Sequence, residues 1–422
     1  MTQRQQLSST YFSILLILFV IGQVCAQNPL ALNQLEQAFQ KNNLQLLAAQ
    51  YNITASRAAV IQARIWDQPY LSTDVNLINP SAGRLFDIGS NGEKGLAIQQ
   101  LIYRGGKKKS EVNFAKSNVE LAELQFEQLV RSLKYALDQD YYSIYFDQKK
   151  IATLDGQIGR LDSLLISYQN QSAINNIPLN QVVRLQSLIL SLRTDRNEIQ
   201  KNITEAHQDL LLISGLTTPV LPIVDEAALK LKYTGLHVSQ DSLAGIAYQY
   251  NPDYLFNLKI IQNQELYLQW QKSLAVPDLT AGLTYDQGGG AFRNQINLTF
   301  GIPLPVWNRN KGNILAAEAQ RDQASTYAAF KKIELKNKIE AAILIWQQYL
   351  NQYNSITPAV TINQETVYQG ILANFQKRNI SLLEFTDFME SHNQTILQLN
   401  EIKKQWVLSG LTINYLINHD VF

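Results

Sequence analysis

Histidine, cysteine, serine and acidic side chains carry most enzyme chemistry and metal binding, and in this 422-residue sequence they form none of the usual arrangements. The four histidines lack the spacing of metal ligands: His207, His237, His392 and His419. There is no Ser-His-Asp arrangement, no Gly-rich nucleotide loop and no Gly-Lys-Ser/Thr phosphate loop. The sequence therefore predicts a protein that is not an enzyme and that holds no cofactor and no metal.

A pair of carboxylates near the C-terminal end is the most suggestive group. Glu384 and Asp387 are three residues apart, which places them on one face of a helix. The alternative is an ordinary solvated helix face, because acidic residues are favoured in the first turns of a helix. Which interpretation applies depends on the elements that position the pair.

The first 26 residues have the three parts of a secretory signal peptide, namely Arg4, an apolar stretch at 11–21, and the small-residue site Val24-Cys25-Ala26. Lipid attachment to Cys25 requires a small residue directly before it, and Val24 stands there. We therefore predict cleavage after Ala26. Cleavage removes the only cysteine and leaves a mature protein that forms no disulfides.

The charge of the chain is balanced, with 36 Lys and Arg against 35 Asp and Glu. Such a balance gives no electrostatic reason to expect a nucleic-acid partner. After residue 26 no stretch approaches 18 consecutive apolar residues, which excludes a transmembrane helix from the mature chain. If this protein spans a membrane, it does so with strands.

The order of predicted elements occurs twice. A helical stretch at 30–66 ends before Pro69, and its counterpart at 238–274 ends before Pro277, an offset of 208 residues. Each is followed by two strands, a basic turn and a long helical hairpin. Other matched positions are Asn43 with Asn251, Lys107 with Lys311, and the breaks at 176–178 and 379–381. We therefore predict a signal peptide at 1–26, a first repeat at 27–220 and a second at 221–422.

The strands alternate between apolar and polar residues with period two. In the second repeat the apolar positions include Leu279, Leu283, Ile296 and Leu298, over the length that a membrane strand needs. In the first repeat the alternation around Leu71 is weaker, and 96–103 is less regular. The alternative interpretation is a half-buried hairpin on a soluble domain.

Four strands are too few to close a barrel. An open sheet edge is not tolerated in lipid, so membrane insertion would require several chains to share one sheet. The loops at 79–92 and 287–294, rich in Gly, Asn and Ser, would then cap the strands on the outer side.

The helical stretches are too long for an ordinary domain. Residues 107–168 contain no proline and would form a helix of about 90 Å at 1.5 Å per residue. Residues 310–375 match this stretch, with a kink predicted at Pro358. At the turns, Pro178 suits the start of a return helix, and Asn176 and Asn379 tolerate the left-handed backbone that a reversal needs.

Duplicated halves, each with two strands and a long helical hairpin, together with a cleaved signal and the Ile-Ser-Leu-Leu-Glu-Phe run at 380–385, resemble the TolC-like outer-membrane efflux proteins. The resemblance covers essentially the whole mature chain and implies a mainly α fold with a small transmembrane β part. It implies a homotrimer in the bacterial outer membrane, in contact with its lipid. There the strands, four per chain, close one twelve-stranded barrel, and the helices form a hollow cylinder through the periplasm.

The resemblance also implies partners. The hairpin tips would contact a periplasmic adaptor protein, which links the channel to an inner-membrane transporter. The tip residues are Asn176, Ile177, Pro178, Asn379, Ile380 and Ser381. This sequence has Asn where the family often has Gly, and a longer first tip, so the particular adaptor stays open.

Family members commonly carry acidic residues just inside the second hairpin, which narrow the periplasmic entrance. Glu384 and Asp387 fall at those positions, and three-fold symmetry would gather them into a ring that attracts cations. The corresponding residues of the first repeat are Gln181 and Arg184. Arg184 is a candidate partner for Asp387 on a neighbouring helix.

The resemblance implies that the protein is the outer-membrane channel of a tripartite pump that exports small molecules or metal ions. The rival interpretation is a soluble periplasmic coiled-coil adaptor or scaffold. Such adaptors usually build one hairpin between the halves of a small β-domain, and the duplication of strands and hairpins argues against that. Family members serve drug, metal and protein exporters, and the lumen-facing polar residues of this sequence give no selective chemistry, so all three substrate classes remain open.

Overall fold

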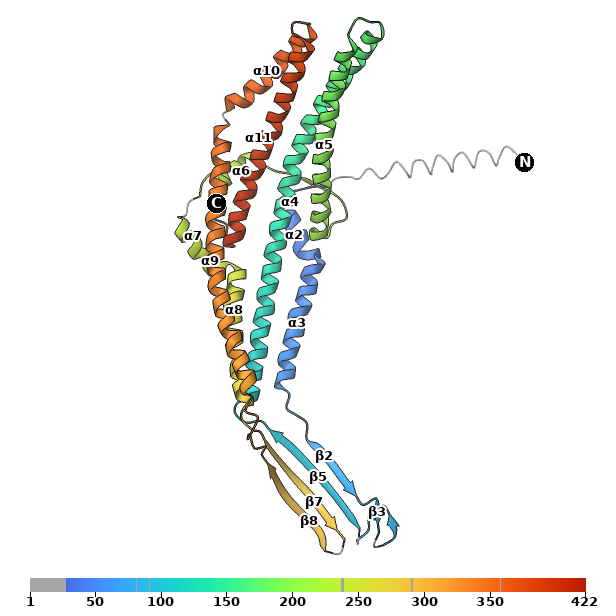
Figure 1. Cartoon of the computed structure of the whole chain (residues 1–422), viewed down its shortest axis with the longest axis vertical. Coiled ribbons are helices and arrows are strands. Elements are labelled where there is room, and N and C mark those ends of the chain that lie inside the picture. The colour runs from blue at the N-terminus through green and yellow to red at the C-terminus, as the bar shows by residue number, and fades with distance from the viewer. Residues whose placement is uncertain (1–27, 81, 91, 237–238, 290, 357) are drawn as a thin grey trace, which may run out of the picture. The chain divides into compact units, whose positions relative to one another are not determined.

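The computed structural model describes residues 28–80, 82–90, 92–236, 239–289, 291–356 and 358–422 (Figure 1). The predicted signal peptide and His237 lie outside the described residues. The chain forms two compact units. The hairpin unit contains the residues up to Leu47, Leu129–Asn251 and Leu335–Phe422, and the sheet unit contains Ala48–Gln128 and Pro252–Glu334. Each unit takes residues from both predicted repeats.

The sheet unit is built around four antiparallel strands. They lie side by side in the order β2 (Tyr70–Val75), β5 (Glu93–Ile102), β7 (Leu279–Gly288) and β8 (Phe292–Gly301), as Figure 1 shows. The central β5·β7 pair joins the two repeats. Beyond β2, a small ladder of β3 (Ile78–Asn79) and β4 (Arg84–Leu85) overlaps the segment predicted as a loop at 79–92.

Helices of both repeats pack together in the sheet unit. α3 (Leu44–Arg64) and the first part of α4 (Lys107–Ala173) are joined by an Arg57–Glu123 ion pair. α8 (Pro252–Leu274) packs on α4, where the buried Asn263 amide donates to Ser117 Oγ at 2.6 Å. α9 (Lys311–Ser355) begins beside α8. These contacts fix the helix ends from which the strands emerge.

None of the helices in the described part of the chain is both long enough and apolar enough to cross a membrane.

The hairpin unit holds the two long helical hairpins. The first consists of α4 and α5 (Leu179–Ser214), and the second of α10 (Pro358–Gln376) and α11 (Leu382–Ile417). α9 ends at Ser355 and α10 begins at Pro358, so the helix is interrupted where the kink was predicted. Near their tips the two hairpins share one apolar cluster: Leu154, Ile158, Leu161, Leu185, Ile189, Leu192, Tyr368, Phe375, Leu382, Phe385 and Met389.

Shorter elements complete the hairpin unit. They are β1 (Asn28–Leu30), which pairs in parallel with β6 (Val220–Pro222), α2 (Leu32–Asn42), α6 (Glu226–Tyr233) and α7 (Gln240–Tyr250). Indole N–H groups of Trp346 and Trp406 both donate to the Tyr233 carbonyl at 3.2 Å. These two bonds fasten the end of α6 between helices of the second repeat.

The stretches predicted as helical at 30–66 and 238–274 each contain two helices, α2 with α3 and α7 with α8. Asn43 and Asn251 cause the division, because each has an extended backbone. The Asn43 amide donates to Ile213 O at 2.7 Å, and the Asn251 amide donates to Leu416 O at 2.7 Å. An extended asparagine whose amide donates to a distant carbonyl occurs at matched positions, and this supports the internal duplication.

Candidate functional site

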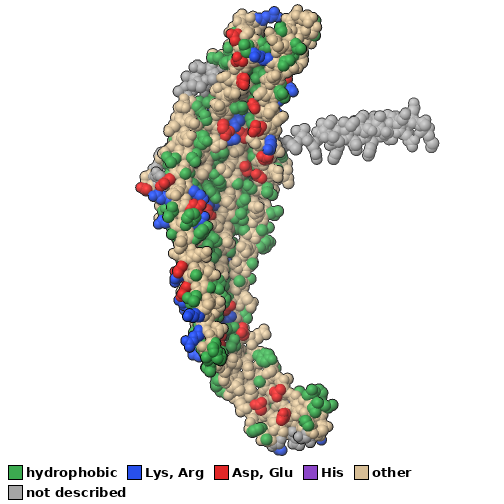
Figure 2. Space-filling view, viewed as in Figure 1, with side chains coloured by type: hydrophobic (Ala, Val, Ile, Leu, Met, Phe, Trp, Pro, Cys, Tyr) green, Lys and Arg blue, Asp and Glu red, His purple; other side chains and the backbone are tan. Residues whose placement is uncertain are grey.

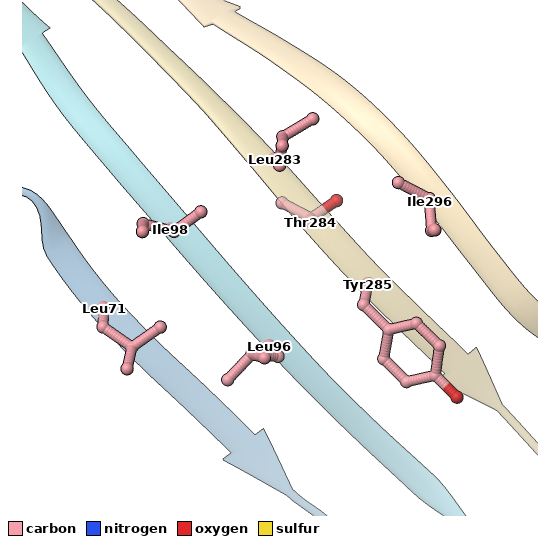
Figure 3. A pocket seen from close by; sticks show the side chains of 7 residues that line it. All are labelled: Leu71, Leu96, Ile98, Leu283, Thr284, Tyr285 and Ile296. Carbon is pink, nitrogen blue, oxygen red and sulfur yellow. The ribbon is translucent and has the colours of Figure 1, made fainter.

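The four-stranded sheet has one apolar face. Residues directly opposite each other in antiparallel strands project to the same side, and the register aligns Leu71, Ile98, Leu283 and Leu298 in one row. A second row contains Leu96, Tyr285 and Ile296. Figure 3 shows side chains of both rows from all four strands lining a shared hollow.

These apolar side chains are uncovered in the single chain. Ile296 is 75% exposed, and Leu298 and Leu283 are 63% and 51% exposed. A contiguous exposed apolar face marks a surface that meets another apolar phase or another protein. The alternation predicted from the sequence for β7 and β8 is present, and pairing extends it across the less regular β5.

The opposite face of the sheet is polar and carries carboxylates. Asp74 and Asp286 both lie opposite Gly95, so they share one row across three strands. Asp286 accepts hydrogen bonds from Thr284 at 3.0 Å and from Asn297 at 2.9 Å. Sequence reasoning missed this pair, because its members are more than 200 positions apart and only the register brings them into one row.

The two hairpin tips reverse the chain in the same way. After α4, Asn175 adopts a left-handed backbone (φ 59°), and the Asn176 N–H donates to Gln171 O at 2.9 Å. After α10, Arg378 does the same (φ 62°), and the Asn379 N–H donates to Asn374 O at 2.9 Å. The left-handed residues are therefore one position earlier than the predicted Asn176 and Asn379. Helices commonly end in this way, with one left-handed residue and a bond that spans the last turn.

Four of the six predicted tip residues are exposed. These are Asn176, Pro178, Asn379 and Ser381, while Ile177 and Ile380 are half-buried. Ile380 packs against the apolar cluster that joins the two hairpins. The exposed tip residues are available to a partner, and Ile380 anchors the second turn.

Glu384 has a local structural role. Ser381 is the N-cap of α11, and its hydroxyl accepts from the Glu384 N–H at 3.2 Å. In return, the Glu384 carboxylate accepts from the Ser381 N–H at 2.8 Å and from the Ser381 hydroxyl at 2.9 Å. These bonds form a capping box and hold the pKa of Glu384 below its ordinary value. The general preference for acidic residues in the first turns of a helix was considered from the sequence, but this specific cap was not predicted.

Asp387 lies three residues further along α11 and is exposed, as is Arg184 on α5. Within the described chain Arg184 and Asp387 form no ion pair with each other. Their pairing therefore stays a prediction, as does the entrance role of Glu384 and Asp387.

A buried ionic cluster ties the two long hairpins together. Lys150 binds Asp147 at 2.9 Å and Glu401 at 2.5 Å, and Lys404 binds Asp147 at 3.1 Å. Burial alone would raise the pKa of Glu401, but hydrogen bonds from Lys150 and Gln405 and the charge of Lys404 lower it to about 2. The sequence held no signal for this cluster, because its halves are about 250 residues apart.

The described histidines are used in packing. His392 stacks on Tyr368, with ring centroids 4.9 Å apart, and His419 stacks on Tyr250 at 5.9 Å. Both ring nitrogens of His207 are buried without a hydrogen-bond partner. In the part of the chain that the structure describes, no group of three metal-binding side chains is close enough to hold an ion.

A four-stranded sheet with an apolar outer face, together with a long helical hairpin in each repeat, is the fold of the TolC-like outer-membrane channels. The chain superimposes on a membrane protein from Pseudomonas aeruginosa with a TM-score of 0.75, 13% identity and 92% of each chain covered. It also superimposes on the Campylobacter jejuni CmeC outer membrane channel, with a TM-score of 0.72, 15% identity, and 92% of this chain and 85% of CmeC covered.

Sequence comparison finds similar proteins of the same kind. Residues 35–216 match the model of the family described as outer membrane efflux protein. The chain is 19% identical over 392 residues to the cobalt-zinc-cadmium resistance protein CzcC of Cupriavidus metallidurans, covering 93% of this chain and 91% of CzcC. The predicted fold class and the predicted resemblance to the TolC-like outer-membrane efflux proteins are therefore confirmed.

Proposed function

We propose that this chain is the outer-membrane channel of a tripartite efflux pump, and that three copies share one barrel. The apolar face of the four-stranded sheet carries the proposal. β2 and β8 form the two ends of the strand order and leave open edges in the single chain. Lipid cannot satisfy the backbone groups of an open edge, so the sheet must close on other copies. Three copies give the twelve strands expected of this fold.

In the proposed barrel, one face of the sheet points outward and the other points inward. The face with Leu283 and Leu298 meets lipid, and the face with Asp74 and Asp286 lines a water-filled passage. The helices extend from the other end of the strands into the periplasm. This arrangement places the protein in the outer membrane with a periplasmic extension.

The partners follow from the exposed hairpin tips. Asn176, Pro178, Asn379 and Ser381 would contact a periplasmic adaptor, which would link the channel to an inner-membrane transporter as the source of energy. Glu384 and Asp387 would line the periplasmic entrance, with Arg184 on the facing helix. The channel itself carries out no reaction and uses no cofactor.

The substrate class is small molecules or metal ions. The similarity to CzcC, a protein named for cobalt, zinc and cadmium resistance, supports metal ions as the cargo. A wide water-filled passage need not bind what moves through it, so few histidines are no obstacle. The rival function, a soluble adaptor or scaffold, would leave the apolar face of the sheet exposed to water.

A pair of neighbouring substitutions tests the barrel. Leu283→Arg and Thr284→Arg add the same charge to adjacent positions of β7, on opposite faces of the sheet. An arginine facing lipid near the middle of the membrane costs about 2–4 kcal/mol, whereas the same residue facing the passage is tolerated. We expect Leu283→Arg to reduce strongly the amount of protein in the outer membrane, and Thr284→Arg to leave it close to the parent level.

The measurement is the fraction of protein that stays in outer-membrane pellets after a urea wash, with the molar mass in detergent determined by light scattering. A trimeric parent that resists the wash supports the shared barrel. If the parent washes off as a monomer, or if the two variants behave alike, the adaptor or scaffold function takes its place.

A further inference from the structure

Cationic and aromatic side chains gather in the sheet unit where the strands meet the helices. We call this region the junction band and define it as residues 64–70, 102–111, 275–279 and 302–311. It contains seven cations: Arg64, Arg104, Lys107, Lys108, Lys109, Arg309 and Lys311. Its acidic residues are Asp67, Glu111 and Asp278. The junction band therefore carries a net charge of +4, although the whole chain carries only +1.

Some of these cations are already used inside the protein. Lys107 binds Asp278 at 2.7 Å with both side chains largely buried, and Lys108 binds Glu111 at 3.1 Å. By contrast, Lys109 and Lys311 are exposed and form no ion pair within the described residues. Arg104 and Arg309 are also exposed, and their guanidinium groups form no ion pair there. The Arg104 backbone N–H donates to the Asp278 carboxylate at 3.1 Å, and Arg309 Nε donates to the Pro305 carbonyl at 3.2 Å.

Aromatic side chains lie among the cations. Trp307 is 95% exposed, Tyr70 67% and Trp66 55%, and the rings of Trp66 and Tyr103 are 5.7 Å apart. Exposed indole and phenol rings are unfavourable in water alone and are enriched at the boundary between lipid and water. Figure 2 shows Lys and Arg side chains next to hydrophobic ones at this end of the helices.

The order of side chains along 300–311 gives the chemistry of the partner. The exposed apolar residues Leu304 and Val306 come first, beyond the end of β8, then Trp307, and then Arg309 and Lys311. A membrane leaflet has the same order, because its hydrocarbon core is followed by the interface and then by the charged headgroups. Lys and Arg beside such an interface attract anionic headgroups.

We propose that the junction band binds the phosphate groups of anionic phospholipids in the leaflet next to the helices. This inference rests on the proposed function, because it requires the sheet to be inserted in a membrane. Three copies would present a closed ring of unpaired cations, which would hold the channel at a fixed depth and retain a shell of anionic lipid.

The test uses the full mature protein in nanodiscs of phosphatidylcholine with or without phosphatidylglycerol, and native mass spectrometry to count retained lipids. Arg104→Gln, Lys109→Gln, Arg309→Gln and Lys311→Gln are combined in one variant. The matched control replaces four exposed lysines of the hairpin unit by Gln: Lys41, Lys201, Lys230 and Lys377. A third variant exchanges Lys and Arg at the four junction positions and keeps their charge.

We expect the parent, the control and the charge-keeping variant to retain phosphatidylglycerol at least tenfold over phosphatidylcholine. The junction variant should lose this preference, and raising the salt concentration should weaken it in the parent. A parent without preference overturns the proposal, as does a control that loses as much as the junction variant. If inorganic phosphate displaces the lipid completely at millimolar concentration, the site binds free anions and the lipid assignment is wrong.

Light scattering on the same preparations separates the two proposals. A trimer that inserts into nanodiscs but retains no phosphatidylglycerol contradicts only the lipid site. A chain that does not insert contradicts the proposed channel.

Discussion

At the first hairpin tip Asn175 adopts the left-handed conformation and Pro178 precedes the return helix, whereas Arg378 and Ser381 take those places at the second tip. The backbone bonds that close the two turns are the same, 203 positions apart. Only the second return helix carries a side-chain cap. The two repeats therefore share the backbone geometry of the reversal, while the side chains that follow are free to differ.

The ends of the strands show the same contrast. Lys107 of the first repeat is buried against Asp278, with side chains 10% and 18% exposed. Its counterpart Lys311 is exposed, and the position that matches Asp278 is Tyr70. The two repeats thus carry lysines at equivalent positions in different environments. Lys107 is buried in an ion pair, and Lys311 is on the surface.

The largest effect is expected from exchanging these lysines for an apolar residue. Lys107→Met leaves the largely buried Asp278 carboxylate without its cation and with only the Arg104 backbone N–H as a donor. Breaking a buried ion pair in this way costs about 3–5 kcal/mol. Lys311→Met changes a surface side chain and should stay within about 0.5 kcal/mol. The free energy of unfolding in urea, measured in detergent, gives both values. Equal losses would contradict the contrast between the two repeats at this position.

A smaller effect is expected at the cap of the second return helix. Ser381→Ala removes the N-cap and should cost about 1 kcal/mol of local stability. Because the pKa of Glu384 is lower in the folded state, the bonds to Glu384 contribute at pH values above its unfolded pKa. That contribution is lost as the pH falls through the lower folded value.

Hydrogen exchange of the backbone amides at the start of α11 measures this effect between pH 7 and pH 3. We expect protection to fall with pH in the parent and to fall less in Ser381→Ala, because the backbone N–H of residue 381 can still donate to Glu384. In Glu384→Gln, which has no carboxylate, protection should not fall. The start of α5 has Pro178 as its N-cap with no side-chain bond, and it serves as the internal control. A similar fall at α5 would show that the change is not caused by Glu384.

The smallest effect is expected on ion conduction. Glu384→Gln with Asp387→Asn removes both charges and keeps a side chain that can still cap the helix. Cation preference in a planar bilayer should decrease by a factor of about two, because a ring of carboxylates at a constriction attracts cations. Glu205→Gln on α5 is the control. Unchanged conduction would assign Glu384 and Asp387 to a solvated helix face.

Much of the fold could be predicted because it is periodic. The alternation of Leu283, Ile296 and Leu298 identified one face of the sheet, and matched prolines identified the repeats. The division of two helices at Asn43 and Asn251 was not predicted, because an asparagine that captures a carbonyl 165 or more residues away leaves no local signal.

The site was predicted less completely for the same reason. The positions of Glu384 and Asp387 on one helix face followed from their spacing. The pairing of Lys107 with Asp278, the row formed by Asp74 and Asp286, and the Lys150 cluster required the register and the packing of distant elements. A left-handed arginine at 378 is also uncommon, since asparagine and glycine adopt that conformation more readily.

The central pair of the sheet determines when the sheet can form. Ile102 of β5 pairs with Leu279 of β7, 177 positions later in the chain, whereas β7 and β8 are joined by a short turn. Contacts between distant segments form slowly, since a long loop must close before they contribute. The β7–β8 hairpin can therefore form early, whereas the β5·β7 pair can form only after the long loop between Ile102 and Leu279 has closed. The apolar face of the sheet is thus assembled in two steps, first within the β7–β8 hairpin and then across the boundary between the two repeats.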